Sequence, residues 1–304
     1  MPAVTGCLRS DRQEVGPSLA SVGVVEHIHI AAVAGAPMRP MAEAHALKGV
    51  GLAGDRYAAA AGYWSDGKVS RDLTLVEAEA LEDLERSYRV GLEPGATRRN
   101  VTTRGVDLNA LLGRIFWVGD ALCQGTHVCE PCRHLDEVTG KSLLRPLVRR
   151  GGLRARLLSG ARIRVGHSIA AVEPRAGVGV IVVRDSRVLL GRRLSEHGFG
   201  TWSFPGGKPL PAETVQRCAL RELHEETGIV ATAPRLIGLT MDGFPRSREV
   251  FRTTFVQVDG SAAQPVAREP EKTIEWDWFG WDELPQPLFA PVASLVATGY
   301  TPGA

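Results

Sequence analysis

Three glutamates on one short segment carry the clearest chemical signal in the sequence. Glu222, Glu225 and Glu226 are spaced i, i+3, i+4, which places their carboxylates on one face of a helix. Three crowded anions repel one another, and a hard divalent cation removes the repulsion while gaining oxygen ligands. Such a cation can neutralise a pyrophosphate and lower the pKa of an attacking water. The segment therefore predicts a Mg²⁺ site, or a Mn²⁺ site, that acts on a phosphate-bearing substrate.

Neighbouring residues fit the same site. Arg221 can pair with Glu213 or Glu225 and hold the carboxylates in place. Gly206 and Gly207 allow backbone conformations that are closed to other residues, and they shape the loop beside the metal. The alternative for the whole segment is a solvated acidic helix face, which is common among proteins in general.

The spacing from Gly207 to Ile229 is Gly-x₅-Glu-x₇-Arg-Glu-apolar-x-Glu-Glu-x-Gly-apolar, matched at every position. Seven fixed identities at this spacing arise by chance on the order of once in 10⁶ chains. This pattern is the Nudix box, and residues 177–304 resemble Nudix hydrolases of the MutT type, which hydrolyse nucleoside triphosphates. The likeness includes the segments Val188-Leu-Leu-Gly-Arg-Arg193, Gly200-Thr-Trp-Ser-Phe-Pro-Gly-Gly207 and Glu269-Pro-Glu-Lys272.

The resemblance assigns roles to residues of this chain. It implies that Glu222, Glu225 and Glu226 hold the metal, and that Glu271 or Glu269 adds a ligand or the general base; a plain surface charge is the alternative for Glu271. The residues expected to take part in catalysis are Glu225, Glu222, Arg221 and Glu271. The residues expected to contact substrate are Gly206, Gly207, Arg192, Arg193 and Lys208, although exposed cations are the alternative for the last three. Trp202 and Phe204 could stack a base or pack in the core.

A second chemical signal lies in the first half of the chain. His127-Val-Cys129-Glu-Pro-Cys132-Arg-His134 places four soft or borderline ligands within eight residues. The segment could hold zinc, but a second distant pair of ligands is missing. It could be a redox pair, but a thioredoxin-like strand and helix do not follow it. One thiolate could instead act as a metal ligand or sulfur carrier, or both cysteines could be buried core residues.

The surrounding segments favour the ligand or carrier role. Residues 21–172 resemble the MOSC domain, which is found in molybdenum-cofactor sulfurases and in molybdenum-dependent reductases of N-hydroxylated compounds. The resemblance implies that Cys132 supplies a thiolate to molybdenum or carries sulfur. It also implies that Arg98, Arg99 and Asn100 grip the phosphate of the cofactor, with solvated arginines as the alternative. The segments that carry the likeness are Gly51-Leu-Ala-Gly-Asp-Arg56, Arg98-Arg-Asn100, Gly105-Val-Asp-Leu-Asn109, the cysteine segment, Arg150-Gly-Gly152 and Val165-Gly166.

The chain departs from full sulfurases and reductases in one respect. It lacks their aminotransferase-like domain, and it lacks a flavin or haem domain to supply electrons. A MOSC domain here would therefore need a separate sulfur or electron donor protein.

The elements that must position these residues fall into two domains. After an arm over residues 1–20, residues 21–172 combine short strands with many turns. A strand at 22–30, a helix at about 75–88 and a strand at 115–118 predict a β-rich, barrel-like domain. Cys123 and Cys218 are expected to be core residues, and Cys7 lies on the arm.

Residues 173–304 follow a different pattern, and Glu173-Pro174-Arg175 forms the joint. Strands at 177–184 and 187–191 flank a two-residue turn, which predicts a hairpin. We expect a helix at about 212–227 that ends at Gly228, strands at 251–258 and 274–279, and a closing helix at 288–300. These elements predict an α/β/α sandwich with a mixed sheet.

Composition sets limits on partners and location. The formal net charge of +2 over 304 residues gives no strong basic field, which argues against binding to a nucleic acid duplex. Arg9, Asp11, Arg12 and Glu14 interrupt any apolar signal segment, and the uncharged stretch from 284 to 304 is broken by prolines, so neither a signal peptide nor a membrane span is expected. Five cysteines, an odd number, argue against a disulfide scaffold and favour the cytoplasm.

Together these patterns predict a MOSC–Nudix fusion. The Nudix half would cleave a nucleoside di- or triphosphate with Mg²⁺, releasing a nucleotide plus phosphate or pyrophosphate and so cleaning the nucleotide pool. The MOSC half would bind molybdenum cofactor or carry sulfur, and would reduce N-hydroxylated bases. One alternative is a pyrophosphatase of ADP-ribose or another dinucleotide. A second is a molybdenum-cofactor carrier with a nucleotide-sensing Nudix half.

Overall fold

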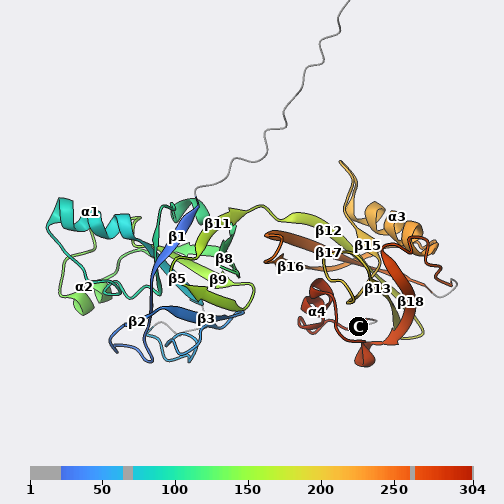
Figure 1. The fold of residues 1–304 in the computed structure, drawn as a ribbon, viewed down its shortest axis with the longest axis horizontal. Helices are drawn as coiled ribbons and strands as arrows, with labels where there is room; N and C mark the ends of the chain where they lie inside the picture. Colours follow the sequence, from blue (N-terminus) through green and yellow to red (C-terminus); the bar gives the residue numbers. More distant parts are fainter. Residues whose placement is uncertain (1–21, 64–70, 261–263, 303–304) are drawn as a thin grey trace, which may run out of the picture.

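The computed structural model describes residues 22–63, 71–260 and 264–302. The predicted arm and Cys7 lie outside these ranges. Figure 1 shows two bodies in chain order, a barrel coloured blue to yellow-green and a sandwich coloured yellow to red. Within the described ranges, no helix combines the length and the apolar character needed to cross a membrane.

The first body is a closed barrel, as the sequence predicts. Strand β1 pairs with β6 on one side and with β11 on the other, so the sheet closes on itself. Pairing is antiparallel around the ring except between β5 and β6, which are parallel. Apolar side chains such as Leu75, Phe116 and Leu153 fill the interior. In ring order the strands are β11 (Ser168–Val172), β7 (Ile115–Val118), β8 (Ala121–Val128), β9 (Leu153–Leu157), β5 (Leu73–Glu77), β6 (Val101–Arg104) and β1 (Gly23–Ile30).

Smaller elements decorate the barrel. The helix predicted from residue 75 begins only at Ala78, because Leu73–Glu77 belongs to the barrel wall, where burial of nearly every side chain favours a strand. The remaining elements are β2 (Arg39–Met41), β3 (Glu43–Leu47), β4 (Gly51–Leu52), α1 (Ala78–Tyr88), the short 3₁₀ helix η1 (Asn109–Leu111), α2 (Arg133–Thr139) and β10 (Ala161–Arg164).

The second body is the predicted α/β/α sandwich. Strand β12 pairs parallel with β17 and antiparallel with β13, so the sheet is mixed. One face packs under α3 through Val180, Val182 and Val256, and the other packs under α4 through Ile181 and neighbouring side chains. The elements are β12 (Arg175–Arg184), β13 (Arg187–Arg193), β14 (Trp202–Ser203), β15 (Gly206–Gly207), α3 (Val215–Thr227), β16 (Arg235–Phe244), β17 (Glu249–Asp259), β18 (Thr273–Gly280), the short 3₁₀ helix η2 (Trp281–Glu283) and α4 (Ala290–Val296).

Local backbone chemistry explains where the prediction holds and where it fails. Asp185 and Ser186 both have positive φ, 46° and 62°, as the tight turn of the predicted hairpin requires. Helix α3 begins three residues later than predicted, because Thr214 accepts a hydrogen bond from the Arg217 backbone N–H and acts as its N-cap. The closing helix spans only Ala290–Val296, and left-handed Gly299 lies in the turn that follows it.

The two bodies share one buried cluster. Trp117 and Leu122 of the barrel pack with Val250 of the sandwich, and Met241 lies against the same cluster. Trp117 is only 2% exposed, so this contact encloses an entire indole. The hairpin of β16 and β17 reaches from the sandwich to the barrel at this point (Figure 1).

Candidate active site

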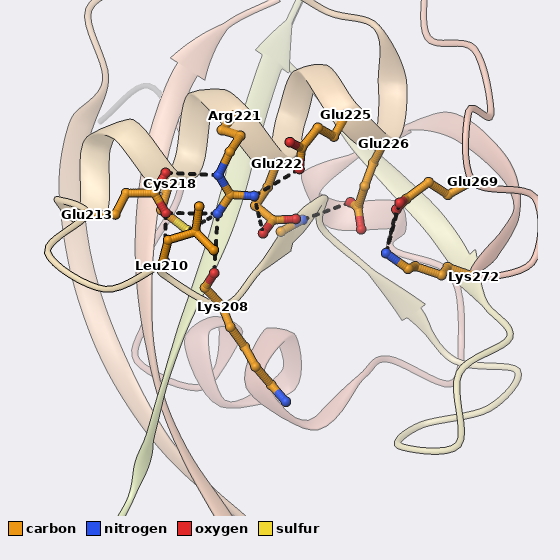
Figure 2. Close-up of polar contacts among 11 residues, drawn as sticks. Lys208, Leu210, Glu213, Cys218, Arg221, Glu222, Glu225, Glu226, Glu269 and Lys272 are labelled. Atoms are coloured by element: carbon orange, nitrogen blue, oxygen red, sulfur yellow. Dashed lines mark hydrogen bonds and ion pairs between the residues drawn. The ribbon is translucent and has the colours of Figure 1, made fainter. Parts of the chain in front are cut away.

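The glutamates of helix α3 face away from the sheet because the opposite face of the helix is packed against it. Cys218, Ala219 and Leu223 are buried against the strands, which confirms Cys218 as a core residue. At its C-terminal end the left-handed Gly228 donates its backbone N–H to the carbonyl of His224, as predicted for the helix stop. The face left over carries the carboxylates shown in Figure 2.

Arg221 is the centre of this face. Its Nη1 donates to Glu222 Oε1 and to Glu225 Oε2, both at 2.8 Å, and its Nη2 donates to Glu213 Oε2 at 2.8 Å (Figure 2). The guanidinium lowers the pKa of Glu213 to about 2, mainly through these hydrogen bonds. The three carboxylates in turn raise the pKa of Arg221 further above its usual value. Arg221 therefore holds three anions in fixed positions.

Glu226 lies deeper than its neighbours. Its Oε2 accepts a hydrogen bond from the backbone N–H of Gly206 at 2.9 Å. Burial, together with the negative charges of Glu222 and Glu269, raises the pKa of Glu226 to about 7, against the opposing effects of the Gly206 hydrogen bond and of Lys272. A buried carboxylate beside two other anions is an electrostatic cost that a bound cation would remove.

The two glycines before the helix are required by their surroundings. A Cβ on Gly207 would lie 2.3 Å from the carboxylate of Glu222. Gly206 has φ of 153°, and a Cβ there would lie 2.1 Å from the carbonyl oxygen of Val178. The loop can approach the carboxylates this closely only because both residues lack side chains.

The structure distinguishes Glu269 from Glu271, either of which could add a metal ligand or the general base according to the sequence. Glu269 forms hydrogen bonds of 2.9 and 2.8 Å with Lys272, and its charge reaches Glu226. Glu271 is exposed, two positions further along the same turn. Glu269 is therefore better placed than Glu271 to assist the cluster.

The residues present fit a hard divalent cation by their chemistry. Glu222, Glu225 and Glu226 offer carboxylate oxygens on one helix face, and the raised pKa of Glu226 shows that burial and neighbouring anions outweigh the stabilising effects of Gly206 and Lys272. In the described part of the chain, no three His, Cys, Asp or Glu side chains converge closely enough to enclose a metal ion. Glu222 and Glu225 are turned toward Arg221 instead.

A pocket opens beside the glutamates and contains two of the three predicted cations. Arg193 lines it, donating to Ser195 Oγ at 2.7 Å and to the carbonyl of His197 at 3.0 Å, and burial lowers the pKa of Arg193. Lys208 lines it as well, with Nζ 5.4 Å from the ring centre of Phe251. Arg192 is exposed and does not line the pocket, because adjacent residues of a strand point to opposite faces.

Aromatic side chains form the wall of this pocket. Phe244 stacks on Phe289 with ring centres 5.7 Å apart and meets Phe251 edge-on at 5.9 Å. His197 joins them, and its Nε2 lies 2.6 Å from the carboxylate of Glu249. This wall is not predicted from the sequence. Its signal there is the alternation of Phe244 and Phe251 with barrel-facing residues on the two paired strands.

The two aromatic residues singled out in the sequence belong to the core. Phe204 is 5% exposed and packs edge-on against Phe255, although one side of it borders the pocket. Trp202 packs edge-on against Phe279.

A second pocket lies on the barrel and collects most of the predicted cofactor residues. Arg98, Arg99 and Cys132 line it together with Arg56 and His134. Cys132 is partly accessible at the start of α2, whereas Cys129 and Cys123 are buried. The four cysteines of the described ranges are all free thiols.

The arginines of the barrel pocket are held by backbone carbonyls. Arg56 is 4% exposed and donates to the carbonyl of Arg98 at 2.8 Å. Arg99 donates to the carbonyl of Gly151 at 2.9 Å. Nη1 of Arg98 donates to the carbonyl of Ala36 at 2.9 Å, while its Nη2 is buried and has no hydrogen-bond partner among the described residues. An unsatisfied cationic donor in a pocket suits an anionic ligand such as a phosphate.

Asn100 does not line the barrel pocket, which removes the support for its predicted contact with the cofactor. The side chain is 1% exposed. Its Oδ1 accepts from Thr74 Oγ1 at 2.8 Å, and its Nδ2 donates to the carbonyl of His29 at 3.3 Å. These bonds tie the start of β6 to β5 and β1, which is a structural role.

Comparisons with known proteins identify the families of the two domains. Residues 173–297 match the family model described as the NUDIX domain, and residues 62–170 match that of the MOSC domain. An oxidized purine nucleoside triphosphate hydrolase from Danio rerio is 31% identical over 35% of this chain and 66% of its own length. The chain thus spans slightly less than two thirds of that relative. An RNA pyrophosphohydrolase from Erythrobacter litoralis is 31% identical over 36% of this chain and 77% of its own length.

Among solved structures, the MutT NUDIX hydrolase from Burkholderia pseudomallei is 32% identical. The match covers 42% of this chain and 98% of that one, with a TM-score of 0.39. The YUAD protein from Bacillus subtilis is 18% identical over 49% of this chain and 95% of its own, with a TM-score of 0.42.

Proposed function

Because the chain belongs to the Nudix hydrolase family and carries a MOSC domain before its Nudix domain, we propose that it hydrolyses nucleoside triphosphates in a reaction that requires Mg²⁺. The observation that carries the proposal is the position of Glu222 and Glu226 at the edge of a pocket that also contains two cations and an aromatic wall. Cations suit the phosphates and aromatic rings suit a nucleobase.

In this proposal Glu222, Glu225 and Glu226 hold Mg²⁺, or Mn²⁺ in its place. The bound ion would neutralise charge on the phosphates and make a water molecule more acidic. Arg221 keeps Glu222 and Glu225 oriented in the free protein. Glu269 would accept a proton from water, and the hydrogen bond from Lys272 to its carboxylate supports this role.

Two features favour a triphosphate over the dinucleotide alternative. Arg193 and Lys208 line the same pocket as Glu222 and Glu226, so one phosphate chain can meet both groups. The name of the Danio rerio relative specifies a purine nucleoside triphosphate.

A substrate panel tests the proposal. The full-length protein is incubated with purine and pyrimidine nucleoside triphosphates, their oxidised and N-hydroxylated forms, a 5′-triphosphate RNA, ADP-ribose and dinucleotides. We expect triphosphates to be the best substrates, with activity abolished by EDTA and restored by Mg²⁺. Preferred cleavage of ADP-ribose would support the dinucleotide alternative. Tight binding of a nucleotide without any product would support the nucleotide-sensing carrier.

For the barrel we propose that Cys132 supplies a thiolate to molybdenum or carries sulfur. Arg56, Arg98 and Arg99 would hold an anionic group of the cofactor, and the orphaned Nη2 of Arg98 is the observation that supports it. The cofactor would supply two-electron chemistry toward N-hydroxylated bases. A separate sulfur or electron donor protein would then serve this site, in the cytoplasm.

Replacement of Cys132 with Ala tests the barrel site. Protein purified from molybdate-supplied cells is expected to lose nearly all bound molybdenum on Cys132→Ala, because a soft metal centre loses its thiolate. Elemental analysis measures the metal content. The matched control is Cys123→Ala, which removes a buried thiol of the barrel interior. Equal molybdenum in wild type and Cys132→Ala would show that this thiol does not bind the metal.

A further inference from the structure

The turn between β16 and β17 contacts both bodies through three consecutive residues. Ser247 Oγ lies 3.0 Å from His197 Nε2, and the Glu249 carboxylate lies 2.6 Å from the same atom. Arg248 points the other way. Its Nη1 donates to the carbonyl of Gly119 at 2.7 Å and lies 3.5 Å from Asp120, on the β7–β8 turn of the barrel.

The strands beside this turn also have one face toward the barrel and one toward the pocket. Gly243 pairs with Val250, and these residues face the barrel, where Val250 is buried beside Trp117. Their neighbours Phe244 and Phe251 point to the opposite face and line the pocket. Because adjacent residues of a strand alternate between faces, one hairpin has a barrel side and a pocket side.

The barrel side of the hairpin is closely fitted. The guanidinium of Arg248 lies over the indole of Trp117, 4.8 Å from the ring centre. A Cβ on Gly243 would lie 2.5 Å from Cη2 of the same indole. The hairpin therefore cannot shift toward the barrel, and the contacts of Arg248 keep it from moving away.

We propose that the barrel positions the nucleoside-binding wall of the Nudix pocket, with Arg248 and Trp117 as the positioning residues. Through Ser247 and Glu249 the clamped turn fixes His197, and through the two strands it fixes Phe244 and Phe251. The inference rests on the proposed function, since it supplies the base and sugar end of the same substrate site. The glutamates come from α3, which packs mainly on β12 and β15. It meets β17 at Val256 and Val258, at the far end of that strand from the clamped turn, so the barrel acts on binding more than on the chemical step.

The first test compares Arg248→Met with Arg246→Met in the full-length protein. Arg246 is exposed on the same turn and serves as the matched control. Arg248→Met is expected to raise KM for the best nucleotide by about 2- to 30-fold with kcat little changed, whereas Arg246→Met leaves both constants unchanged. Thermal unfolding establishes that both variants are folded.

The second test uses the close approach at Gly243, and it does not depend on Arg248→Met folding. Gly243→Ala should raise KM in the same way by forcing the hairpin off the indole. Adding Trp117→Phe removes the clashing atoms and should return KM toward the wild-type value. If Gly243→Ala raised KM only through a local defect in the pocket, a substitution in the barrel such as Trp117→Phe would not restore KM.

Unchanged KM in folded Arg248→Met and Gly243→Ala would overturn the inference. If the wild type turns over no nucleotide, the proposed function fails, and calorimetric Kd values for the same nucleotide replace KM. Weaker binding by the two variants would then support the positioning role, and equal binding would overturn it. A wild type that neither hydrolyses nor binds nucleotides would overturn both proposals.

Discussion

Glu225→Gln is expected to lower kcat for nucleoside triphosphate hydrolysis by at least about 100-fold, as for the loss of one strong electrostatic group from a reaction centre. Amide oxygen is a poorer ligand for Mg²⁺ than carboxylate oxygen, and the substitution leaves the shape of the side chain unchanged. The Glu225 side chain is 50% exposed, with its carboxylate on Arg221, so the fold should tolerate the change. Initial rates at saturating substrate and Mg²⁺ measure the effect.

The matched control for Glu225→Gln is Glu275→Gln, an exposed glutamate on β18. It should retain the wild-type kcat. If Glu225→Gln also retains it, the carboxylate of Glu225 has no role in the reaction, and the metal would have to be held without it.

The second large effect concerns pH. In the absence of metal, the free energy of unfolding should fall as pH rises from 4.5 to about 7. The reason is that the pKa of Glu226 is 4.5 in the unfolded chain and about 7 in the folded protein. The folded state binds this proton more tightly than the unfolded state does. The stability that the proton on Glu226 contributes is therefore complete below pH 4.5 and is lost as pH passes about 7. The full change amounts to about 3 kcal/mol.

Urea unfolding in EDTA at about pH 5 and about pH 8, for wild type and Glu226→Gln, measures this contribution. The glutamine variant cannot ionise, so it should lose less stability between the two pH values. Added Mg²⁺ should restore the wild type at the higher pH by binding the folded state alone. Parallel changes in the two proteins would contradict a raised pKa at Glu226.

Much of the candidate site could be predicted because its signal is local. One turn of helix brings Glu222, Glu225 and Glu226 together whatever the rest of the fold does, and Gly228 marks the helix end by its own conformation. The order of strands and turns likewise indicated a barrel followed by a mixed sheet, since individual strands and turns leave short-range patterns in the sequence.

Other site residues needed the tertiary structure. Either Arg192 or Arg193 could face the pocket, and only the orientation of β13 decides between them. The contacts of Asn100 could not be predicted, because the residues that satisfy its amide are 26 and 71 positions away. Arg248 is 129 positions from its partner on the barrel, and no periodicity in the sequence connects two such distant turns.

The closure of the barrel also has a consequence for biosynthesis. β1 (Gly23–Ile30) is the first barrel strand to leave the ribosome, but its two partners in the ring are β6 and β11, and β11 begins only at Ser168. At about 5–20 residues per second, the wait for that last strand is roughly 7 to 30 s. During this time the edge of β1 that pairs with β11 lacks that partner, although β6 is made earlier, and unpaired edges are where growing chains aggregate. Slow, late pairing of distant strands is therefore built into the order of the strands, and chaperone demand during synthesis should fall on the first half of the chain.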